Sequence, residues 1–435
     1  MIKLPSKYDY LEITEEISQF LDVVMNTDSN IALIGGAGVG KTEILKLLSD
    51  RDVYNHNCIV GCPTGIAAVN ASTDGVRAQT LHSLFRLPPL GIIPPEKLKV
   101  HEDLAPLMKA LHTLIIDEVS MVNSDLLTKI LFLLGQYRNG EPIRLILIGD
   151  PSQLAPIVKS GDESAYLQDM YKGQFFFNTD IFQSMRILQL TKVFRQKDLA
   201  FKEVLRRFRF NKQTDEDIDF INTRYMDIDD FRDLGGEFIH IALTNRTVNN
   251  VNEKELELNK NPTKTYMGKN YYYPERELPV PLNLNLKMDT QVMIVANNRA
   301  QGYYNGQLGK VVGLYGDRIE IASEGKIYSI EPFTWERYKY AYNKEKKTIS
   351  ANVNGSFKQF PVKIGYAITS HKSQGLTLDR VYLDLERNTF ASGQLYTALS
   401  RVTTLEGLGL ARRVKQKDNK LNKKVKKFYK KNKIA

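Results

Sequence analysis

The sequence is poor in the residues that build zinc sites. Cysteine occurs twice among 435 residues, at Cys58 and Cys62, on either side of the apolar segment 59–61. A cysteine zinc site of the common kind needs two such pairs, and the sequence has no second pair. This excludes a zinc centre of that kind, and we expect both thiols to be small side chains of the protein core.

Long apolar runs are also missing. The segment Ile130-Leu131-Phe132-Leu133-Leu134 is among the longest, whereas a membrane-spanning helix needs about 20 apolar residues. The first ten residues do not have the basic and then apolar layout of a secretory signal. We therefore expect no membrane partner and an intracellular, cytoplasmic protein, with a nuclear location left open. The length predicts two to four domains.

Acidic residues are nearly absent from the C-terminus. Residues 412–435 contain twelve Lys or Arg and one acid, so this tail carries +11 of a total charge of +10, and the rest of the chain is close to neutral. A short amphipathic helix is predicted by three apolar residues at helical spacing among the lysines, Leu421, Val425 and Phe428. The tail either docks this apolar stripe on its own domain or binds a nucleic-acid backbone.

A glycine-rich loop follows the apolar run Ile31-Ala32-Leu33-Ile34. Residues 35–42 have the spacing G-x-x-x-x-G-K-T and lead into a helical apolar pattern. In such a phosphate loop, backbone N–H groups close around the β-phosphate, the lysine reaches the β- and γ-phosphates, and the threonine binds Mg²⁺. The expected ATP contacts are Gly36, Gly38, Val39, Gly40, Lys41 and Thr42. A glycine turn without this function is the alternative, and it leaves the strict spacing unexplained.

Two further apolar strands end in groups that suit ATP hydrolysis. Asp117 and Glu118 follow the strand 112–116, where the first acid would bind Mg²⁺ through water and the second would activate the attacking water. Gln153 follows the strand 144–148 and is placed to sense the γ-phosphate. An ordinary turn would have the same composition around Gln153.

Groups suited to nucleic-acid contact follow two other strands. Pro63 and Thr64 open a helix of small residues, and Thr80 and His82 belong to a cluster of hydroxyl, imidazole and aromatic groups. Such groups hold a single strand by phosphate contact and base stacking, although a stretch of either kind, taken alone, is more often an ordinary loop or helix cap. Gln19, on a helix upstream of the phosphate loop, is either an adenine contact or a surface glutamine.

The second half of the chain supplies two candidate γ-phosphate arginines. Arg195 lies just past a strand, and Arg401 lies seven residues after Gln394 on one helix face. A surface arginine is the alternative for Arg195. Alternating apolar residues, glycines and tyrosines over 285–360 predict a small antiparallel barrel inserted as a module. The proline-rich segment 87–95 is either a rigid protrusion or a buried connection.

Together these motifs resemble the Pif (petite integration frequency) and RecD-like DNA helicases of superfamily 1. The resemblance runs nearly end to end and rests on the stretches 35–42, 62–70, 80–85, 116–121, 149–157, 193–196, 371–377 and 393–401. The most specific are Phe194-Arg195-Gln196 and His371-Lys372-Ser373-Gln374-Gly375. Residues 139–143, Asn-Gly-Glu-Pro-Ile, stand where eukaryotic Pif proteins have Pro-Phe-Gly-Gly, which indicates a bacterial or viral relative.

The resemblance implies an α/β fold with two RecA-like P-loop NTPase domains of parallel sheets and an inserted SH3-like β-barrel. The expected domains are an N-terminal ATPase domain at 1–186 with a wedge loop at about 86–100, a second RecA-like domain at 187–284 and 361–411, the insert at 285–360, and the basic tail at 412–435. The implied site places Lys41, Thr42, Asp117, Glu118 and Gln153 in the first domain. Arg195, Arg401, Gln374 and Gly375 then contribute to the nucleotide site from the second.

The resemblance further implies an ATP- and Mg²⁺-dependent 5′-to-3′ DNA helicase, in a family with roles in replication, repair, recombination and telomere maintenance. Single-stranded DNA would contact Pro63, Thr64, Thr80 and His82 in one domain and Thr369, His371 and Lys372 in the other. The expected partners are single-stranded DNA and forked or tailed duplexes, and the free protein is expected to be a monomer. Three alternatives remain: a translocase that strips proteins with little unwinding, an ATP-gated clamp with negligible turnover, and RNA as the tracking strand.

Overall fold

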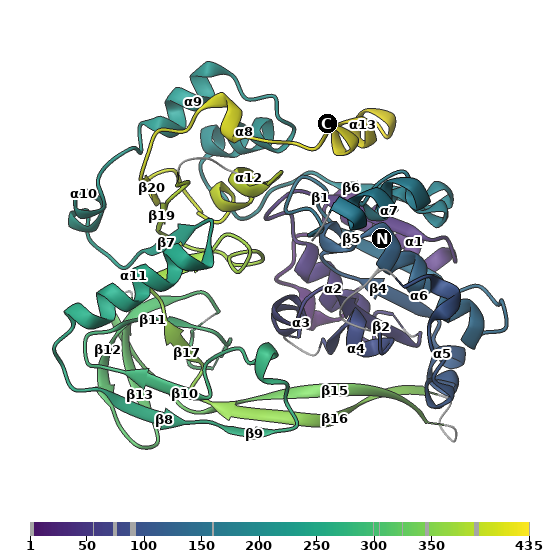
Figure 1. The fold of residues 1–435 in the computed structure, drawn as a ribbon, viewed down its shortest axis with the longest axis horizontal. Helices are drawn as coiled ribbons and strands as arrows, with labels where there is room; N and C mark the ends of the chain where they lie inside the picture. Colours follow the sequence, from purple (N-terminus) through teal and green to yellow (C-terminus); the bar gives the residue numbers. More distant parts are fainter. Residues whose placement is uncertain are drawn as a thin grey trace. The chain divides into compact units, whose positions relative to one another are not determined.

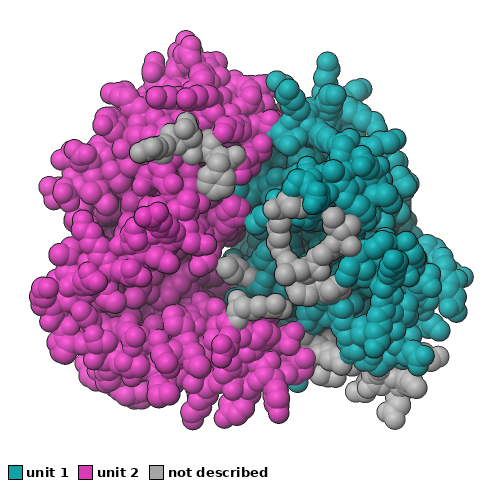
Figure 2. Space-filling view, viewed as in Figure 1, with its two compact units in different colours: residues 1–194, 338–353, 422–435 teal, residues 195–337, 354–421 magenta. Residues whose placement is uncertain are grey.

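The computed structural model describes the chain in ten ranges, residues 4–54, 56–72, 76–87, 93–158, 161–298, 300–303, 305–323, 325–343, 348–386 and 391–434. The chain divides into two compact units, coloured separately in Figure 2. Unit 1 comprises residues 1–194, 338–353 and 422–435, and unit 2 comprises residues 195–337 and 354–421.

Unit 1 is built on a six-stranded parallel sheet with the strand order β3-β2-β4-β5-β1-β6 (Figure 1). Its strands are β1 (Ile31–Gly35), β2 (Cys58–Cys62), β3 (Ala78–Thr80), β4 (Thr113–Ile116), β5 (Arg144–Gly149) and β6 (Arg186–Leu190). The sheet extends past the boundary expected at residue 186, because β6 pairs with β1 from Arg186 to Leu190. The sequence did not reveal the pairing of β6 with β1, because this pairing joins strands about 150 residues apart.

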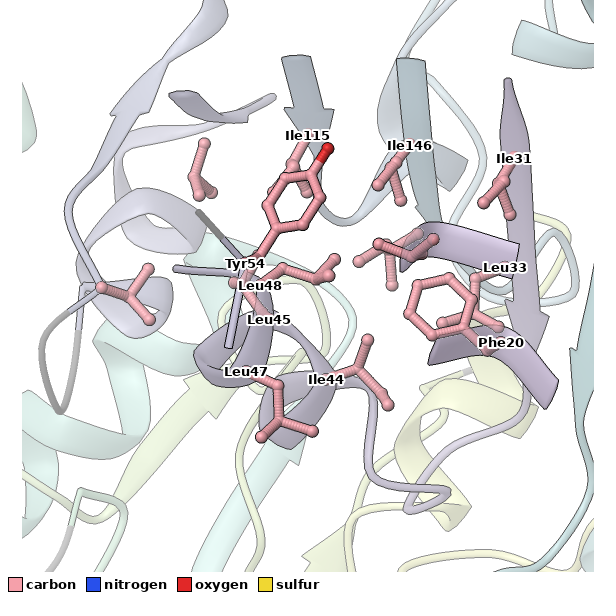
Figure 3. Close-up of a cluster of buried hydrophobic side chains, with 14 of the residues drawn as sticks. Phe20, Ile31, Leu33, Ile44, Leu45, Leu47, Leu48, Tyr54, Ile115 and Ile146 are labelled. Atoms are coloured by element: carbon pink, nitrogen blue, oxygen red, sulfur yellow. The ribbon is translucent and has the colours of Figure 1, made fainter. Parts of the chain in front are cut away.

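The sheet is parallel because its central strands are apolar on both faces. Ile31, Leu33, Ile115 and Ile146 join one buried cluster, and the alternate residues of these strands are equally buried. Figure 3 shows this cluster, where Ile44, Leu45 and Leu48 of α2 (Lys41–Ser49) and Phe20 of α1 (Glu15–Asn26) pack on the sheet. This core fixes the start of α2, and therefore the loop before it.

The remaining helices of unit 1 are α3 (Gly65–Ala71), α4 (Leu81–Leu84), α5 (Ala105–Ala110), α6 (Ser124–Tyr137), α7 (Gly161–Tyr171) and α13 (Lys423–Lys431). A helix is thus present in the basic tail as α13, which belongs to unit 1. It begins at Lys423, so Val425 and Phe428 of the predicted stripe lie on it, whereas Leu421 precedes it. Most of the proline-rich segment expected as a wedge, residues 88–92, lies outside the described residues.

Unit 2 contains a four-stranded parallel sheet, in the order β18-β7-β19-β20. The strands are β7 (Ile239–Ala242), β18 (Ala367–Thr369), β19 (Val381–Leu383) and β20 (Leu408–Leu410). The helices are α8 (Leu199–Arg209), α9 (Asp215–Asn222), α10 (Ile228–Asp233), α11 (Asn245–Leu258) and α12 (Gln394–Leu399). The sequence pattern over 201–210 predicts a basic amphipathic helix, and this helix is present as α8, which buries Phe201, Val204, Leu205 and Phe208.

Unit 2 also holds a five-stranded antiparallel sheet, in the order β14-β13-β12-β11-β17. Its strands are β11 (Gln291–Ile294), β12 (Leu308–Leu314), β13 (Ile319–Ser323), β14 (Lys326–Ile330) and β17 (Val362–Ile364). The paired strands β8 (Lys264–Met267) and β10 (Asn283–Leu286) share its core. A further sheet contains β9 (Lys269–Tyr271), β15 (Phe333–Asn343) and β16 (Thr348–Gln359).

The apolar pattern over 362–368 predicts one buried strand, whereas the structure has two strands in different sheets. β17 pairs with β11 of the antiparallel sheet, and β18 pairs with β7 of the parallel sheet. The chain changes sheet at Gly365, where an added Cβ atom would lie 2.6 Å from the Met293 backbone nitrogen. The sequence pattern merged the two strands because both are apolar.

The expectation for the two cysteines is met. Cys62 is fully buried in the core of unit 1 and Cys58 packs against that core, and both are free thiols. None of the helices in the described part of the chain has the length and apolar character that crossing a bilayer requires.

Candidate nucleotide and nucleic-acid site

The phosphate loop leaves β1 and wraps over the start of α2. Gly38 and Gly40 have φ angles of 74° and 87°, a region that favours glycine, and Gly40 caps α2. The Lys41 ammonium donates to the carbonyl oxygens of Gly35 at 2.9 Å and Gly36 at 2.6 Å. Lys41 therefore lies over the loop, where its charge suits a nucleotide phosphate, and Val39 is buried beneath it.

The two acids stand at the end of β4, which lies second from β1 in the sheet. Burial and the neighbouring Glu118 raise the pKa of Asp117 to about 7, although Lys41 opposes the shift. A bound cation would relieve this penalty, so the acid suits Mg²⁺ binding together with the Thr42 hydroxyl at the start of α2. Glu118 has a φ of 49°, a strained value for a residue with a side chain.

The loop after β5 carries the expected γ-phosphate sensor. Gln153 is 4% exposed, its backbone N–H donates to the Asp150 carbonyl at 3.0 Å, and its side-chain amide lies 3.5 Å from Asp150 Oδ2. Asp150 itself is fully buried and also accepts a hydrogen bond from the Ser152 N–H at 3.2 Å. The position of Gln153 thus depends on a buried carboxylate three residues before it.

The expected nucleic-acid residues of unit 1 lie at the same edge of the sheet. β2 and β3 are parallel neighbours in which Cys62 pairs with Thr80, so Pro63, Thr64 and Thr80 all stand at carboxyl ends of strands. Thr64 caps α3 by accepting from the Ala67 N–H at 3.2 Å, and Thr80 caps α4 by accepting from the Ser83 N–H at 3.3 Å. Each hydroxyl is a helix cap that keeps its own proton for donation.

Two other expected residues are placed less distinctively. His82 is half-buried on α4. Gln19 is exposed on α1, away from the buried residues of that helix, which is the arrangement of a surface glutamine as much as of an adenine contact.

In unit 2, a tight turn follows β18. The Thr369 hydroxyl accepts a hydrogen bond from the Lys372 N–H at 3.2 Å. This bond brings two of the expected contacts to single-stranded DNA together on one turn, and half-buried His371 lies between them in the sequence. Gln374 is buried in this turn, and Gly375 turns the chain with a φ of 83°. Burial lowers the pKa of His371, so its imidazole is neutral at pH 7.

The two expected arginines meet at Ser400, just after α12. Arg195 donates to the Ser400 carbonyl at 3.0 Å, and Arg401 donates to the Ser400 hydroxyl at 2.8 Å. Arg401 is 1% exposed and also donates to the Thr397 carbonyl at 2.8 Å. Arg401 therefore supports the end of α12, an arrangement that the spacing to Gln394 did not predict.

Sequence reasoning missed Ser400 and Tyr429. Ser400 precedes Arg401 and has no motif character of its own. Tyr429 follows Val425 by four residues, so the helical spacing used for the tail places it beside the predicted stripe, and its hydroxyl was the available signal. Its hydrogen bond to Asp150 joins residues 279 apart in the sequence.

Comparison with known proteins agrees with this geometry. Residues 18–226 match the family model described as an AAA domain. The solved structure of Bacteroides sp Pif1 in complex with ADP-AlF4 has a TM-score of 0.87 and 33% sequence identity, with 97% of both chains covered. Bacteroides Pif1 bound to ssDNA is also 33% identical over 97% of both chains, with a TM-score of 0.69.

A curated relative extends the match. The ATP-dependent DNA helicase Pif1 of Campylobacter jejuni is 27% identical over 400 residues, which cover 86% of this chain and 87% of the relative. The parallel sheet, the phosphate loop and the paired acids of unit 1 form a RecA-like P-loop domain of the kind found in the Pif1 structures. This chain belongs to the Pif1 family of helicases.

Proposed function

We propose that this protein is an ATP-dependent DNA helicase that moves 5′ to 3′ on single-stranded DNA and unwinds duplexes. The observation that carries the proposal is the phosphate loop and the Asp117–Glu118 pair on one parallel sheet, in a chain that matches a Pif1 bound to ADP-AlF4 over nearly its whole length. The 5′-to-3′ direction rests on the family resemblance.

In this proposal unit 1 provides the chemistry of hydrolysis. Lys41 and the backbone of Gly36, Gly38, Val39 and Gly40 bind the phosphates, and Thr42 and Asp117 hold Mg²⁺, which neutralises phosphate charge. Glu118 orients and deprotonates the attacking water, and Gln153 responds to the γ-phosphate. Gln19 is assigned to adenine.

Unit 2 supplies the positive charge for the transition state. We assign to Arg195 and Arg401 the stabilisation of the negative charge that develops on the γ-phosphate. Gln374 and Gly375 are assigned positions beside the nucleotide. The four-stranded parallel sheet supports the assignment of this unit as a second RecA-like domain. We assign the antiparallel strands that the chain forms between β7 and β18 to an inserted SH3-like barrel, which is wider than the expected range 285–360 because it includes β8, β10 and β17.

Single-stranded DNA binds through groups at the carboxyl ends of strands. Pro63, Thr64, Thr80 and His82 contact it from unit 1, and the turn with Thr369, His371 and Lys372 contacts it from unit 2. Capping hydroxyls and turn N–H groups suit phosphate oxygens, which fits a motor that reads no sequence. A wedge at residues 86–100 splits the duplex.

The outer face of α13 is assigned to nucleic-acid phosphates. The helix docks through Val425, Phe428 and Tyr429, whereas Lys423, Lys426, Lys427 and Lys430 are exposed. The two alternatives for the tail are therefore compatible. Among the described residues, no acid forms an ion pair with any lysine between 423 and 433. Phosphate would compensate this charge.

The proposal is tested by measuring strand separation in the presence of ATP and Mg²⁺. The two substrates are otherwise identical duplexes, one with a 5′ and one with a 3′ single-stranded overhang. We expect unwinding from the 5′ overhang alone. Unwinding from the 3′ overhang would overturn the direction. DNA-stimulated ATP hydrolysis without unwinding of either duplex would favour a translocase, and binding without hydrolysis would favour a clamp.

A further inference from the structure

The C-terminal helix is an integral part of the first unit. Phe428 stacks on Phe177 with ring centroids 4.5 Å apart and planes at 17°, and it lies 5.6 Å from the ring of Phe182. Val425 and Ile434 are 1% and 4% exposed on the same side. This aromatic and aliphatic packing fixes where the neighbouring Tyr429 points.

Tyr429 reaches the loop that follows β5. Its hydroxyl donates to Asp150 Oδ1 at 3.0 Å and lies 2.6 Å from the Ser152 hydroxyl. The same Asp150 oxygen accepts the backbone N–H of Ser152 at 3.2 Å. Tyr429, Asp150 and Ser152 are 4%, 0% and 2% exposed, so water does not replace these bonds when one is lost.

The carboxylate at the centre of this network also holds the next part of the loop. Gln153 donates its backbone N–H to the Asp150 carbonyl and lies with its side-chain amide 3.5 Å from Asp150 Oδ2. One oxygen of Asp150 is thus held by Tyr429 and Ser152, while the other faces Gln153. A rotation of this carboxylate moves the partner of the Gln153 amide.

We propose that Tyr429 is a positioning residue for Gln153, acting through Asp150 from the far end of the chain. The inference rests on the proposed function, because it takes Gln153 as the group that responds to the γ-phosphate. Tyr429 touches neither ATP nor DNA in this role. Its loss should therefore slow hydrolysis and leave nucleotide affinity unchanged, since a displaced catalytic side chain lowers kcat.

The test compares Tyr429→Phe with a matched variant, Tyr54→Phe, in the full chain. Tyr54 is 1% exposed, its hydroxyl lies 2.6 Å from the Thr113 hydroxyl, and it accepts from Arg144 at 3.2 Å, at the amino ends of β4 and β5. Both variants lose one buried tyrosine hydroxyl, but only Tyr429 lies beside the Gln153 loop. Thermal unfolding monitors the structural cost of each.

We expect Tyr429→Phe to lower the kcat of DNA-stimulated ATP hydrolysis by about 10-fold, with KM for ATP within about twofold of wild type. Tyr54→Phe should keep the wild-type kcat, even if its Tm falls as much as that of Tyr429→Phe. Equal kcat values for the two variants would overturn the proposal. Asp150→Asn, which keeps the side-chain volume, should reproduce the loss of kcat.

A double variant separates this proposal from the proposed function. If Tyr429 acts through Gln153, then Tyr429→Phe has no further effect on kcat in a Gln153→Ala background. If the effects of Tyr429→Phe and Gln153→Ala on kcat multiply in the double variant, then Tyr429 acts by another route. This result would overturn the inference and leave the helicase function standing. A wild-type protein without DNA-stimulated hydrolysis would overturn the proposed function itself.

Discussion

Arg195 and Arg401 converge on one residue, because the first donates to the backbone carbonyl of Ser400 and the second donates to its hydroxyl. Arg195 reaches Ser400 from about 200 residues away in the sequence, whereas Arg401 is its direct neighbour. Their burial differs, since Arg401 is 1% exposed whereas Arg195 is half-buried. Substitutions at the two positions should consequently have different effects.

Arg401→Ala should lower both stability and hydrolysis, whereas Arg195→Ala should lower hydrolysis alone. Arg401→Ala removes the hydrogen bonds that the guanidinium donates to the carbonyls of Thr397, Ser373 and Leu376 and creates a cavity, which costs about 3 kcal/mol of unfolding free energy. Denaturant titration and ATP turnover measure the two effects. An Arg195→Ala variant that keeps wild-type turnover would refute its assignment to the γ-phosphate.

Two substitutions in unit 1 separate nucleotide binding from hydrolysis. Lys41→Ala should abolish ATP turnover and weaken ATP binding, because it removes the positive charge over the phosphate loop. Glu118→Gln should bind ATP as the wild type does, with kcat lowered by at least about 100-fold, since it removes the proposed base. Glu43→Gln on α2 is the matched control and should turn over normally. Normal turnover of Glu118→Gln would contradict the catalytic assignment.

We expect DNA binding to depend on pH because of the Lys363 side chain. Burial and the neighbouring Lys372 lower the pKa of Lys363 to about 8. A DNA phosphate bound at Lys372 would raise the pKa of Lys363, so DNA binding is coupled to the uptake of a proton by Lys363. The contribution of protonated Lys363 to DNA affinity is therefore fully present below pH 8. It is lost as the pH rises through the higher pKa that Lys363 has in the complex. Affinity for a single-stranded oligonucleotide should fall between pH 7 and pH 9.5 at constant ionic strength.

Two methionine variants test the origin of this pH dependence. Lys363→Met should flatten it, because the titrating group is gone. Lys358→Met, at an exposed lysine of β16, should leave it intact. Equal pH dependence in Lys363→Met and wild type would assign the proton uptake to another group.

The exposed lysines of α13 should contribute to the salt dependence of DNA binding. We expect the fourfold glutamine variant at 423, 426, 427 and 430 to reduce the slope of log K against log salt by about 0.7 per lost phosphate on single strands and about 0.9 on duplexes. The docked side of the helix is unchanged, so the Tm should stay the same. Fluorescence anisotropy across a salt series measures the slope.

A control with the same change of charge shows whether the effect is local. Glutamine at Lys109, Lys212, Lys254 and Lys260 removes four exposed lysines elsewhere in the chain. Equal slopes for the two variants would mean that α13 makes no phosphate contact of its own.

The sequence revealed those parts of the molecule that local patterns encode. The glycine loop and Asp117 with Glu118, each after an apolar strand, indicated an ATPase, because spacing along one strand–loop–helix unit carries the information. The family followed from all eight motif stretches together, above all from 194–196 and 371–375. The helix at 201–210 and four of the five strands of the antiparallel sheet, β11 to β14, followed from apolar periodicity in the same way. These features depend on neighbours within about ten residues.

Features that depend on distant partners were not predictable. The pairing of β6 with β1 and the change of sheet at Gly365 are set by which strands lie side by side, and an apolar run is compatible with several neighbours. The meeting of Arg195 with Ser400 and of Tyr429 with Asp150 depends on packing that brings distant segments together.

The return of the chain to unit 1 at its C-terminus also determines how the molecule resists being pulled. Force applied from the C-terminal side of α13 reaches this helix before any other element of unit 1, and within the described part of the chain its contacts to the rest of the unit are made through side chains rather than through strand pairing. Its removal takes Tyr429 away from Asp150 before the parallel sheet carries any load. A single mechanical step at the C-terminus would thus disconnect the Gln153 loop from its support while most of the fold remains intact.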